Sequence, residues 1–459
     1  MNEILKVRNP YTQEVIGEYP VNPLSSVKMK ITNAHEAQSK WKKISLGKRI
    51  EAVQKALEYF NVNRDAIAKD ISQQMGRPIS QAGGEISGLL ERGNYLCSIA
   101  HEGLQTVTLP EKPGFYRAIT REPLGLIFVI SAWNYPLLVT VNSVVPALLA
   151  GNAVLLKHSS QTPTIGTHFQ KAFGDLCEID HLLQQIIVDH VTTGKIIEEL
   201  DVQHVVFTGS VKGGSEILKH TAKKFMQPQL ELGGKDAAYV AEDADIASAA
   251  ATVVDGAMFN SGQSCCGIER AYVHKSVYQE FMQQCQKVIA DYKMGDPLDQ
   301  ATNLGPLVSE KAAHFVDAQV KAAVAQGAKI QAGGKMVKLG KGYFYEPTLM
   351  SDVRQSMEII QEENFAPVLP VIAVDSLEQA ITYVNDSQYG LTSAIFTQNM
   401  DQAKKFADEV NTGTVFMNRC DYLDPALPWT GVKNSGCGSA LSHLGFLSVT
   451  RAKAIHFKK

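Results

Sequence analysis

Apolar runs and amphipathic stretches alternate along most of the chain. Residues 126–130 read Leu-Ile-Phe-Val-Ile without a polar position, as expected of a strand that is buried on both faces of a sheet. The apolar stretch 137–149, which ends just before Gly151, predicts a helix, and a second strand is predicted at 153–157. Strands that alternate with helices are typical of βαβ units and therefore of a parallel sheet.

This alternation continues in two series. The first series adds a helix after Pro163 and strands at 186–188 and 205–207. The second series starts after Gly234, and its strands and helices are expected at 237–240, 245–258, 271–273, 277–292, 310–326, 368–374, 392–396 and 414–417. The two series predict an α/β fold with two parallel-sheet domains, in which ligands bind beyond the carboxyl ends of the strands.

The N-terminal part carries charged and apolar residues at helical spacing. The stretches 46–75 and 85–101 are therefore expected to be mostly helical. The most apolar region, 124–156, contains Asn134 and Pro136, so it offers no clean span of about 20 residues for a membrane helix. The N-terminus has no apolar segment followed by small residues, so we expect no signal peptide and a cytoplasmic protein.

Composition and charge narrow the range of partners. The 459 residues include 44 Lys and Arg and 47 Asp and Glu, which gives a formal net charge of −3 with the two signs interspersed. This balance argues against nucleic acid or an anionic membrane surface as a partner. The 7 cysteines include no C-x-x-C pair and the chain has no H-E-x-x-H, so we expect neither a disulfide framework nor a metal site.

Two residues in separate segments are candidates for covalent and acid–base chemistry. Cys265 follows a small polar loop with a glycine at 262, which would leave its thiol at a cleft where a thiolate acts as a nucleophile. A buried structural cysteine is the alternative. Glu231 ends an apolar segment before two glycines, where burial would raise its pKa and suit it to general base catalysis. A glutamate in a salt bridge is the alternative there.

Two further segments suggest charge stabilisation and phosphate binding. Asn134 directly follows the first buried strand, where its side-chain amide could stabilise an oxyanion or cap a helix. Residues 205–214 combine a strand, a glycine turn and a helix start, an arrangement that places a phosphate on helix N–H groups. The turn is not a full G-x-G-x-x-G, so by itself it is a weak signal.

Taken together and in this order, these segments resemble the aldehyde dehydrogenase superfamily over nearly the whole chain. The separation between Glu231 and Cys265 also resembles the family's spacing of base and nucleophile. The matching segments are Trp133-Asn134-Tyr135-Pro136, Lys157 with Gln161-Thr162-Pro163, Phe207-Thr208-Gly209-Ser210, Glu231-Leu232-Gly233-Gly234, Gly262-Gln263-Ser264-Cys265, Glu362-Glu363-Asn364-Phe365-Ala366-Pro367 and Lys433-Asn434-Ser435-Gly436-Cys437-Gly438.

The resemblance implies NAD(P)-dependent oxidation of a small-molecule aldehyde to a carboxylic acid. Cys265, and not Cys266, would form a thiohemiacetal whose oxyanion Asn134 stabilises. Hydride would pass to the nicotinamide, and Glu231 would activate the water that hydrolyses the thioester. Two alternatives stay open: a catalytically silent family member that serves as a structural or binding protein, and a coenzyme-A-acylating enzyme, against which the carboxylate at position 231 weighs.

The implied cofactor is NAD or NADP. By resemblance, Lys157 would hold the adenosine ribose, Gly209 and Ser210 would face the pyrophosphate, and Glu363 and Phe365 would position the nicotinamide ribose and ring. Further cofactor contacts are expected from Ser131, Trp133, Ser160, Gly214, Leu232 and Gly233. Family members restricted to NAD often have Glu where Ser160 stands, so its absence removes repulsion of a 2′-phosphate and we expect NADP to be tolerated.

The chain departs from the family pattern outside the Cys–Glu–Asn set. Residues that differ from the common ones are Ala132, His158, Ala366, Ser439 and Ala440, and the segment 188–194 lacks the glycine-rich stretch of many members. For the substrate tunnel, aromatic content near the catalytic segments favours Tyr135, Leu138, Met258, Phe259, Cys266, Tyr422 and Trp429. The aldehyde itself is not readable from these residues.

The resemblance also implies a domain division. The Rossmann-like dinucleotide-binding domain would comprise 1–103 and 122–232, the catalytic domain 233–432, and the oligomerisation elements 104–121 and 433–459. Alternating polarity at 105–109 and 116–121, with prolines and a glycine between, supports a β-hairpin in the first of these elements. An edge strand of this kind pairs readily with another subunit, so we expect a homodimer or homotetramer.

Overall fold

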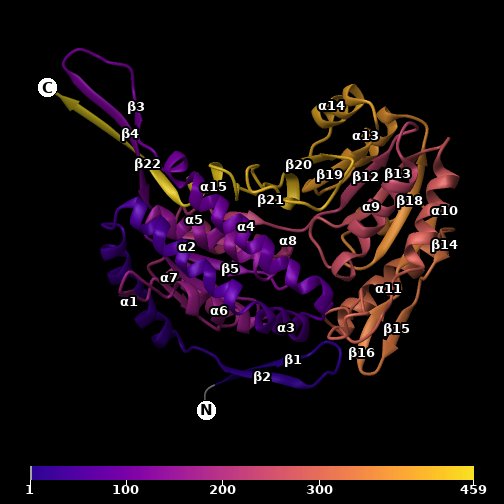
Figure 1. Cartoon of the computed structure of the whole chain (residues 1–459), viewed down its shortest axis with the longest axis horizontal. Helices are drawn as coiled ribbons and strands as arrows, with labels where there is room; N and C mark the ends of the chain where they lie inside the picture. The colour runs from indigo at the N-terminus through magenta and orange to yellow at the C-terminus, as the bar shows by residue number, and fades with distance from the viewer. Residues whose placement is uncertain (1–2) are drawn as a thin grey trace.

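The computed structural model describes residues 3–459, and two sheets with their helices lie side by side in it (Figure 1). The first sheet has six strands in the order β21-β11-β10-β5-β6-β9. They are β5 (Leu126–Ser131), β6 (Ala153–His158), β9 (Leu183–Gln185), β10 (His204–Thr208), β11 (Gln229–Glu231) and β21 (Gly436–Cys437). Neighbouring strands are parallel except β21, which pairs antiparallel with β11.

Helices cover both faces of the first sheet. They are α1 (Leu24–Trp41), α2 (Leu46–Val62), α3 (Arg64–Met75), α4 (Ile79–Gly103), α5 (Leu138–Ala150), α6 (Pro163–Phe173), α7 (His190–Glu199) and α8 (Val211–Ala222). On one face of β5, Ile127 and Val129 pack with residues of α2 to α6. On the other face, Leu126, Phe128 and Ile130 pack with residues of α1, α7 and α8. Both faces of the strand are buried, which explains its unbroken apolar run.

The second sheet has seven strands in the order β14-β17-β18-β13-β12-β19-β20. They are β12 (Asp236–Val240), β13 (Ile268–His274), β14 (Lys329–Ala332), β17 (Thr348–Ser351), β18 (Val368–Val374), β19 (Thr392–Phe396) and β20 (Thr414–Met417). The edge strand β14 pairs antiparallel, and the other neighbours are parallel. One face packs against α9 (Ile246–Met258) and α10 (Tyr278–Ile289), the other against α11 (Glu310–Ala325), α13 (Leu377–Asn385) and α14 (Met400–Glu409).

A three-stranded sheet projects from the first half of the molecule (Figure 1). It consists of β3 (Val107–Thr108), β4 (Phe115–Pro123) and the C-terminal strand β22 (Thr450–Lys458). β22 lies antiparallel to β4 over its whole length, with Thr450 opposite Pro123 and Lys458 opposite Phe115. The projecting strands leave apolar side chains in solvent, and the side chain of Phe457 is 61% exposed.

The remaining elements are short. They are β1 (Ile4–Arg8), β2 (Val15–Pro20), β7 (Asp175–Leu176), β8 (Ile179–Asp180), β15 (Met336–Leu339), β16 (Gly342–Tyr345), α12 (Glu358–Gln361), α15 (Leu444–Ser448) and the 3₁₀ turns η1 (Phe259–Gly262) and η2 (Lys433–Ser435). Among the described residues, no helix combines the length and the apolar character needed to cross a membrane.

The structure confirms the predicted α/β fold and most of its elements, with two differences. The stretch 46–75 forms two helices, α2 and α3, which meet at Asn63. The strand predicted at 186–188 is wrong, because the strand at this place is β9, which ends at Gln185. Ile186 and Val188 are apolar because they are buried in the core beside α7, just beyond the strand; the N–H of Ile186 still donates to the backbone oxygen of Leu156 in β6 at 2.8 Å.

Candidate active site

The candidate catalytic residues meet at the carboxyl ends of the strands of the first sheet. Asn134 follows β5, and Glu231 is the last residue of β11. Cys265 comes from the second half of the molecule, in the loop between η1 and β13. All three side chains line one cavity of about 200 Å³. The rest of its wall is Ala132, Trp133, Thr208, Gly209, Ser210, Leu232, Gly233, Glu363 and Phe365.

A second cavity, of about 120 Å³, adjoins the first and shares this cysteine in its wall. Cys265 and Glu231 line both cavities. The remaining wall of the smaller one is Arg92, Tyr135, Leu138, Val139, Asn142, Thr208, Leu232, Phe259, Cys266, Asp421, Leu423 and Trp429. The thiol can therefore be reached from two cavities. The wall of the larger cavity contains many of the predicted cofactor residues, and the wall of the smaller cavity is mainly apolar.

The loop before Cys265 has an unusual backbone. Asn260, Ser261 and Gly262 have positive φ angles of 54°, 57° and 69°. A Cβ at position 262 would lie 2.2 Å from the backbone carbonyl carbon of Ala366, so only glycine fits there. The side-chain amide of Asn260 donates to the backbone oxygens of Asn134 and Gln263, both at 3.1 Å. These bonds connect the cysteine loop to the loop that carries Asn134.

The two adjacent cysteines differ in their surroundings. Cys265 is partly exposed and faces both cavities, whereas Cys266 is only 5% exposed. The thiol of Cys266 donates to Oδ1 of Asp421 at 2.9 Å. Its pKa is raised by the hydrogen bond with Cys265, by burial and by the charge of Asp421. Cys266 is therefore held as a thiol, and Cys265 is the better candidate for the thiolate.

Glu231 combines burial with hydrogen bonds from neighbouring side chains. It is 6% exposed, and burial raises its pKa to about 7. The Nε2 of Gln229 donates to its Oε1 at 3.0 Å, which, together with the nearby charge of Arg92, lowers the pKa in part. A carboxyl group with a pKa near neutrality can accept a proton from water at working pH.

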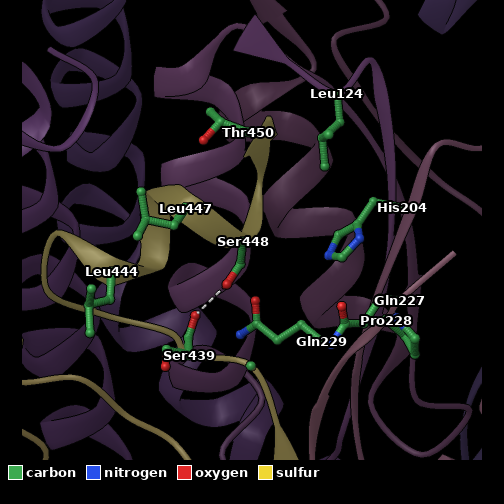
Figure 2. A pocket seen from close by; sticks show the side chains of 11 residues that line it. Leu124, His204, Gln227, Pro228, Gln229, Ser439, Leu444, Leu447, Ser448 and Thr450 are labelled. Carbon is green, nitrogen blue, oxygen red and sulfur yellow. Dashed lines mark hydrogen bonds between the residues drawn. The ribbon is translucent and has the colours of Figure 1, made fainter. Parts of the chain in front are cut away.

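Gln229 also lines a separate cavity of about 440 Å³ at the amino ends of β10 and β11, which Figure 2 shows. Around it lie His204, Ser439 and Ser448, and Ser448 Oγ donates to the backbone oxygen of Ser439 at 2.8 Å. None of the residues predicted as catalytic or cofactor-binding lines this cavity. The side chain of Gln229 thus separates it from Glu231.

A buried ion pair that the sequence analysis missed supports the Asn134 loop. Arg77 and Glu85 are 2% and 4% exposed and pair through Nη1 and Oε2. Arg77 also donates to the backbone oxygen of Asn134 and, at 2.9 Å, to Oδ1 of Asn260. Glu85 Oε1 accepts the backbone N–H groups of residues 137 and 138, at 2.7 and 3.2 Å. The pair therefore fixes the turn between β5 and α5.

A second buried ion pair, which the sequence did not predict, supports the loop that carries Glu363 and Phe365. Lys235 Nζ lies 2.7 Å from Oε2 of Glu269, and both side chains are almost fully buried. The same carboxylate accepts the backbone N–H groups of Asn364 and Phe365 at 2.9 and 3.0 Å. Phe365 has a φ of 53°, so this loop has the left-handed backbone that non-glycine residues adopt only when they are held.

The predicted nicotinamide and pyrophosphate residues lie around the 200 Å³ cavity. The Trp133 and Phe365 rings meet edge to face, with centroids 5.7 Å apart. Ser210 caps α8 by accepting the N–H of Gly213 at 3.2 Å. Glu363 Oε1 accepts the N–H of Gly234 at 3.0 Å, and burial raises the pKa of Glu363 to about 8.

Gly214 and Gly233, both predicted to contact the cofactor, lie where a side chain would not fit. A Cβ on Gly214 would come within 2.7 Å of the Leu232 side chain, so this glycine lets α8 pack on the strand end. A Cβ on Gly233 would come within 2.7 Å of the Glu363 carboxylate. Both glycines allow close packing beside the cavity, and Gly214 does not line it.

The other three predicted cofactor residues lie outside the wall of this cavity. Lys157 is 7% exposed on β6, and burial lowers its pKa. Ser160 is exposed in the turn after β6. Ser131 is buried at the end of β5, where its Oγ accepts a hydrogen bond from Thr140 at 2.9 Å. The cofactor roles of all three stay predictions.

The predicted tunnel residues are partly placed at the 120 Å³ cavity. Tyr135, Leu138, Phe259, Cys266 and Trp429 line it. Met258 and Tyr422 do not line this cavity: Met258 is fully buried in the core beneath the second sheet, and Tyr422 is at the surface and donates to Glu91. Their place in a substrate tunnel stays a prediction. Sequence reasoning missed the polar members Arg92, Asn142 and Asp421, although a charged residue on the apolar face of α4 was a usable signal. Within residues 3–459, no cluster of His, Cys, Asp and Glu could hold a metal ion.

Comparisons with known proteins agree with the geometry. A family model described as "Aldehyde dehydrogenase family" matches residues 1–455. The 3,6-anhydro-alpha-L-galactose dehydrogenase of Vibrio sp. (strain EJY3) is 31% identical over 98% of this chain and 95% of its own. The succinate-semialdehyde dehydrogenase [NADP(+)] of Deinococcus radiodurans is 32% identical over 97% and 93%. A structure of indole-3-acetaldehyde dehydrogenase complexed with NAD+ has a TM-score of 0.95 at 29% identity, covering 100% of this chain and 94% of that one.

Proposed function

The chain belongs to the aldehyde dehydrogenase family, and on that premise we propose how its residues divide the oxidation of an aldehyde to a carboxylic acid. The enzyme depends on NAD or NADP. In the proposal Cys265 is the nucleophile, Asn134 an oxyanion donor and Glu231 the general base. The observation that carries the proposal is that Cys265 and Glu231 line both cavities, so the cysteine can face the aldehyde on one side and the cofactor on the other.

The first step is addition of the Cys265 thiolate to the aldehyde carbon, which gives a thiohemiacetal oxyanion. The side chain of Asn134 and the backbone N–H of Cys265 would donate hydrogen bonds to that oxygen. One such donor typically lowers the barrier by about 3 kcal/mol. Asn134 suits this role because its own backbone is fixed by Arg77 and Asn260, so the amide needs little reorganisation during the reaction.

The larger side of the site fits a pyridine dinucleotide. The 200 Å³ cavity and an adjoining one of about 310 Å³ share Trp133, Ser210, Glu363 and Phe365. The N-terminus of α8 opens beside Ser210, and helix N–H groups favour a pyrophosphate. The two aromatic rings offer an apolar wall for the nicotinamide, and Lys157 and Ser160 are proposed for the adenosine ribose. When bound, the cofactor accepts the hydride that leaves the thiohemiacetal carbon.

Glu231 would complete the cycle by hydrolysis. With a pKa of about 7 it can take a proton from a water molecule that attacks the thioester carbon. The carbon–sulfur bond then breaks, the carboxylic acid leaves and Cys265 returns as a thiolate. A coenzyme-A-acylating reaction does not need this base, and a silent family member needs neither Glu231 nor Cys265, so the presence of both favours hydrolysis.

The residue roles proposed above also give each of the two sheets its own task. We propose that the first sheet with its helices binds the dinucleotide and that the second presents the nucleophile. The projecting sheet of β3, β4 and β22 has exposed edges and apolar side chains such as Tyr116 and Phe457. Exposed edges of this kind pair readily with a second subunit. We therefore propose a homodimer or homotetramer in which this sheet contacts a neighbour.

The proposal is tested by following the absorbance of the reduced cofactor with a panel of short aldehydes. The wild-type protein is expected to produce reduced cofactor and acid without an added thiol. Cys265→Ser is expected to lose this activity, whereas Cys266→Ser keeps most of it. A requirement for coenzyme A would support the acylating alternative, and inactivity with every aldehyde would support the silent one.

A further inference from the structure

Arg92 is a buried cation in the wall of the smaller cavity, and the only part given to it above is the charge that helps to lower the pKa of Glu231. It lies on α4 and is 8% exposed. Its recorded hydrogen bond is a long one, from Nη1 to Oδ1 of Asn142 at 3.3 Å. A guanidinium has five N–H donors, so most of its donor capacity is directed at the cavity or its immediate surroundings.

An acceptor stands in the same wall. Asp421 has a positive φ of 53° on the loop that follows β20, and its Oδ1 accepts the thiol of Cys266. Its second oxygen, Oδ2, has no hydrogen bond recorded within residues 3–459. The loop and α4 are linked at the surface as well, because Tyr422 donates to Glu91 at 2.8 Å. The cavity wall thus holds a donor from one segment and an acceptor from another.

The rest of this wall is mostly apolar. Its large members are Tyr135, Leu138, Val139, Phe259, Leu423 and Trp429. At about 120 Å³ the cavity is smaller than the one of about 200 Å³ on the side of the predicted cofactor residues. An aldehyde whose carbonyl carbon reaches Cys265 must therefore be short, and its remaining atoms lie against both the apolar wall and the Arg92–Asp421 pair.

The chemistry of this pair selects between kinds of short aldehyde. An unsubstituted chain would displace water from Arg92 and Asp421 and leave both without a partner, which is costly in a confined space. A carboxylate would pair with Arg92 but would face the carboxyl groups of Asp421 and Glu231. A hydroxyl group accepts from a guanidinium and donates to a carboxylate at the same time.

We propose that the substrate is a short aldehyde that carries a hydroxyl group near its carbonyl, and that Arg92 and Asp421 determine this specificity. The inference rests on the proposed function, because it takes the cavity beside Cys265 as the aldehyde site. Burial raises the pKa of Asp421 to about 7, with Cys266 and Arg92 lowering it in part. In either protonation state the carboxyl group keeps an oxygen that accepts a hydrogen bond from the substrate.

The test compares two aldehydes of the same chain length, propanal and 2-hydroxypropanal, with 4-oxobutanoate as the acidic probe. The wild-type kcat/KM is expected to be about 10- to 100-fold higher for the hydroxyaldehyde, as expected for hydrogen bonds to charged groups. Arg92→Met is expected to remove this preference. Loss of the Arg92 charge also raises the pKa of Glu231, but this acts on both aldehydes alike and cancels in the ratio of their kcat/KM values. The matched control is Arg64→Met, whose guanidinium binds Gly83 and Ser87 on the outer side of α4 and does not line the cavity.

Each outcome bears on the specificity proposal, on the proposed aldehyde oxidation, or on both. Equal kcat/KM values for the two aldehydes, or a preference for 4-oxobutanoate, overturn the specificity proposal but leave the proposed oxidation standing. No oxidation of any of the three removes both. If Arg92→Met does not fold, Asp421→Asn retains the size of the side chain and weakens its acceptor. That variant is expected to reduce the ratio several-fold, and an unchanged ratio overturns the proposal.

Discussion

The amide Nε2 of Gln229 donates a hydrogen bond to Oε1 of Glu231, and the two atoms lie 3.0 Å apart. This bond stabilises the ionised carboxylate and opposes the effect of burial on its pKa. Replacing Gln229 by Met keeps the side-chain length and removes the donor. The pKa of Glu231 is then expected to rise above its value of about 7.

Because Glu231 acts as a base only when ionised, the rising limb of the pH profile of kcat is expected to shift to higher pH in Gln229→Met, by about one pH unit. Steady-state rates between pH 6 and about 9 measure this limb. Gln227→Met is the matched control, since Gln227 lines the 440 Å³ cavity but is exposed and makes no recorded bond to Glu231. An unshifted profile would show that Gln229 does not set this pKa.

The buried pair Arg77–Glu85 is expected to be essential for stability and for the oxyanion site. Glu85→Gln leaves the Arg77 guanidinium buried without a counter-charge, which typically costs about 3–5 kcal/mol. Urea unfolding is expected to show this loss in the free energy of unfolding. In the folded fraction, kcat is expected to fall because the Asn134 loop loses its support. A variant with wild-type stability and kcat contradicts this account.

Glu269 is expected to act on cofactor binding through the loop that it holds. Glu269→Gln weakens the bonds to the N–H groups of Asn364 and Phe365, so KM for the cofactor is expected to rise about 10-fold, more than KM for the aldehyde. The double variant Lys235→Met, Glu269→Gln removes the unpaired buried charge and is expected to regain stability but not cofactor affinity. Equal changes in both KM values would indicate a general structural defect.

Because Ser160 does not repel a 2′-phosphate, we expect the enzyme to use NADP as well as NAD. Introducing a carboxylate by Ser160→Glu would repel the 2′-phosphate and accept a hydrogen bond from the 2′-hydroxyl of NAD. The kcat/KM for NADP is expected to fall about 10-fold or more, which corresponds to about 1.4 kcal/mol, with little loss for NAD. Ser160→Gln, of the same length without the charge, is the control. A strict preference of the wild-type protein for NAD would show that this position does not decide cofactor choice.

Much of the fold was predictable because burial and secondary structure agree along the sequence. The run 126–130 is apolar at every position because both faces of β5 are buried, and its short length favours a strand over a helix. The same signal failed at 186–188, because Ile186 and Val188 are buried although the strand β9 already ends at Gln185. An apolar run indicates that its residues are buried, whereas the neighbouring strand determines which of them form the hydrogen-bond ladder.

The candidate site was predictable where the chemistry lies in short local segments. Asn134 follows a strand, Glu231 ends one and Cys265 follows a glycine turn, and all three line one cavity. The supporting pairs were not predictable, because nothing near Glu85 or Glu269 indicates which distant backbone N–H groups their carboxylates accept. Such contacts depend on the packing of α4 on α5 and of β13 beside the 363–365 loop.

The central claim is that Cys265 carries the acyl group and that Glu231 releases it. Mass spectrometry of Glu231→Gln, incubated with oxidised cofactor and an aldehyde that the wild-type protein oxidises, tests this most directly. We expect about one equivalent of reduced cofactor, followed by very slow turnover, and one acyl group on the peptide 259–270 that fragmentation places on Cys265. An acyl group on Cys266, or continued turnover of the variant at the wild-type rate without an acyl adduct, would contradict the account.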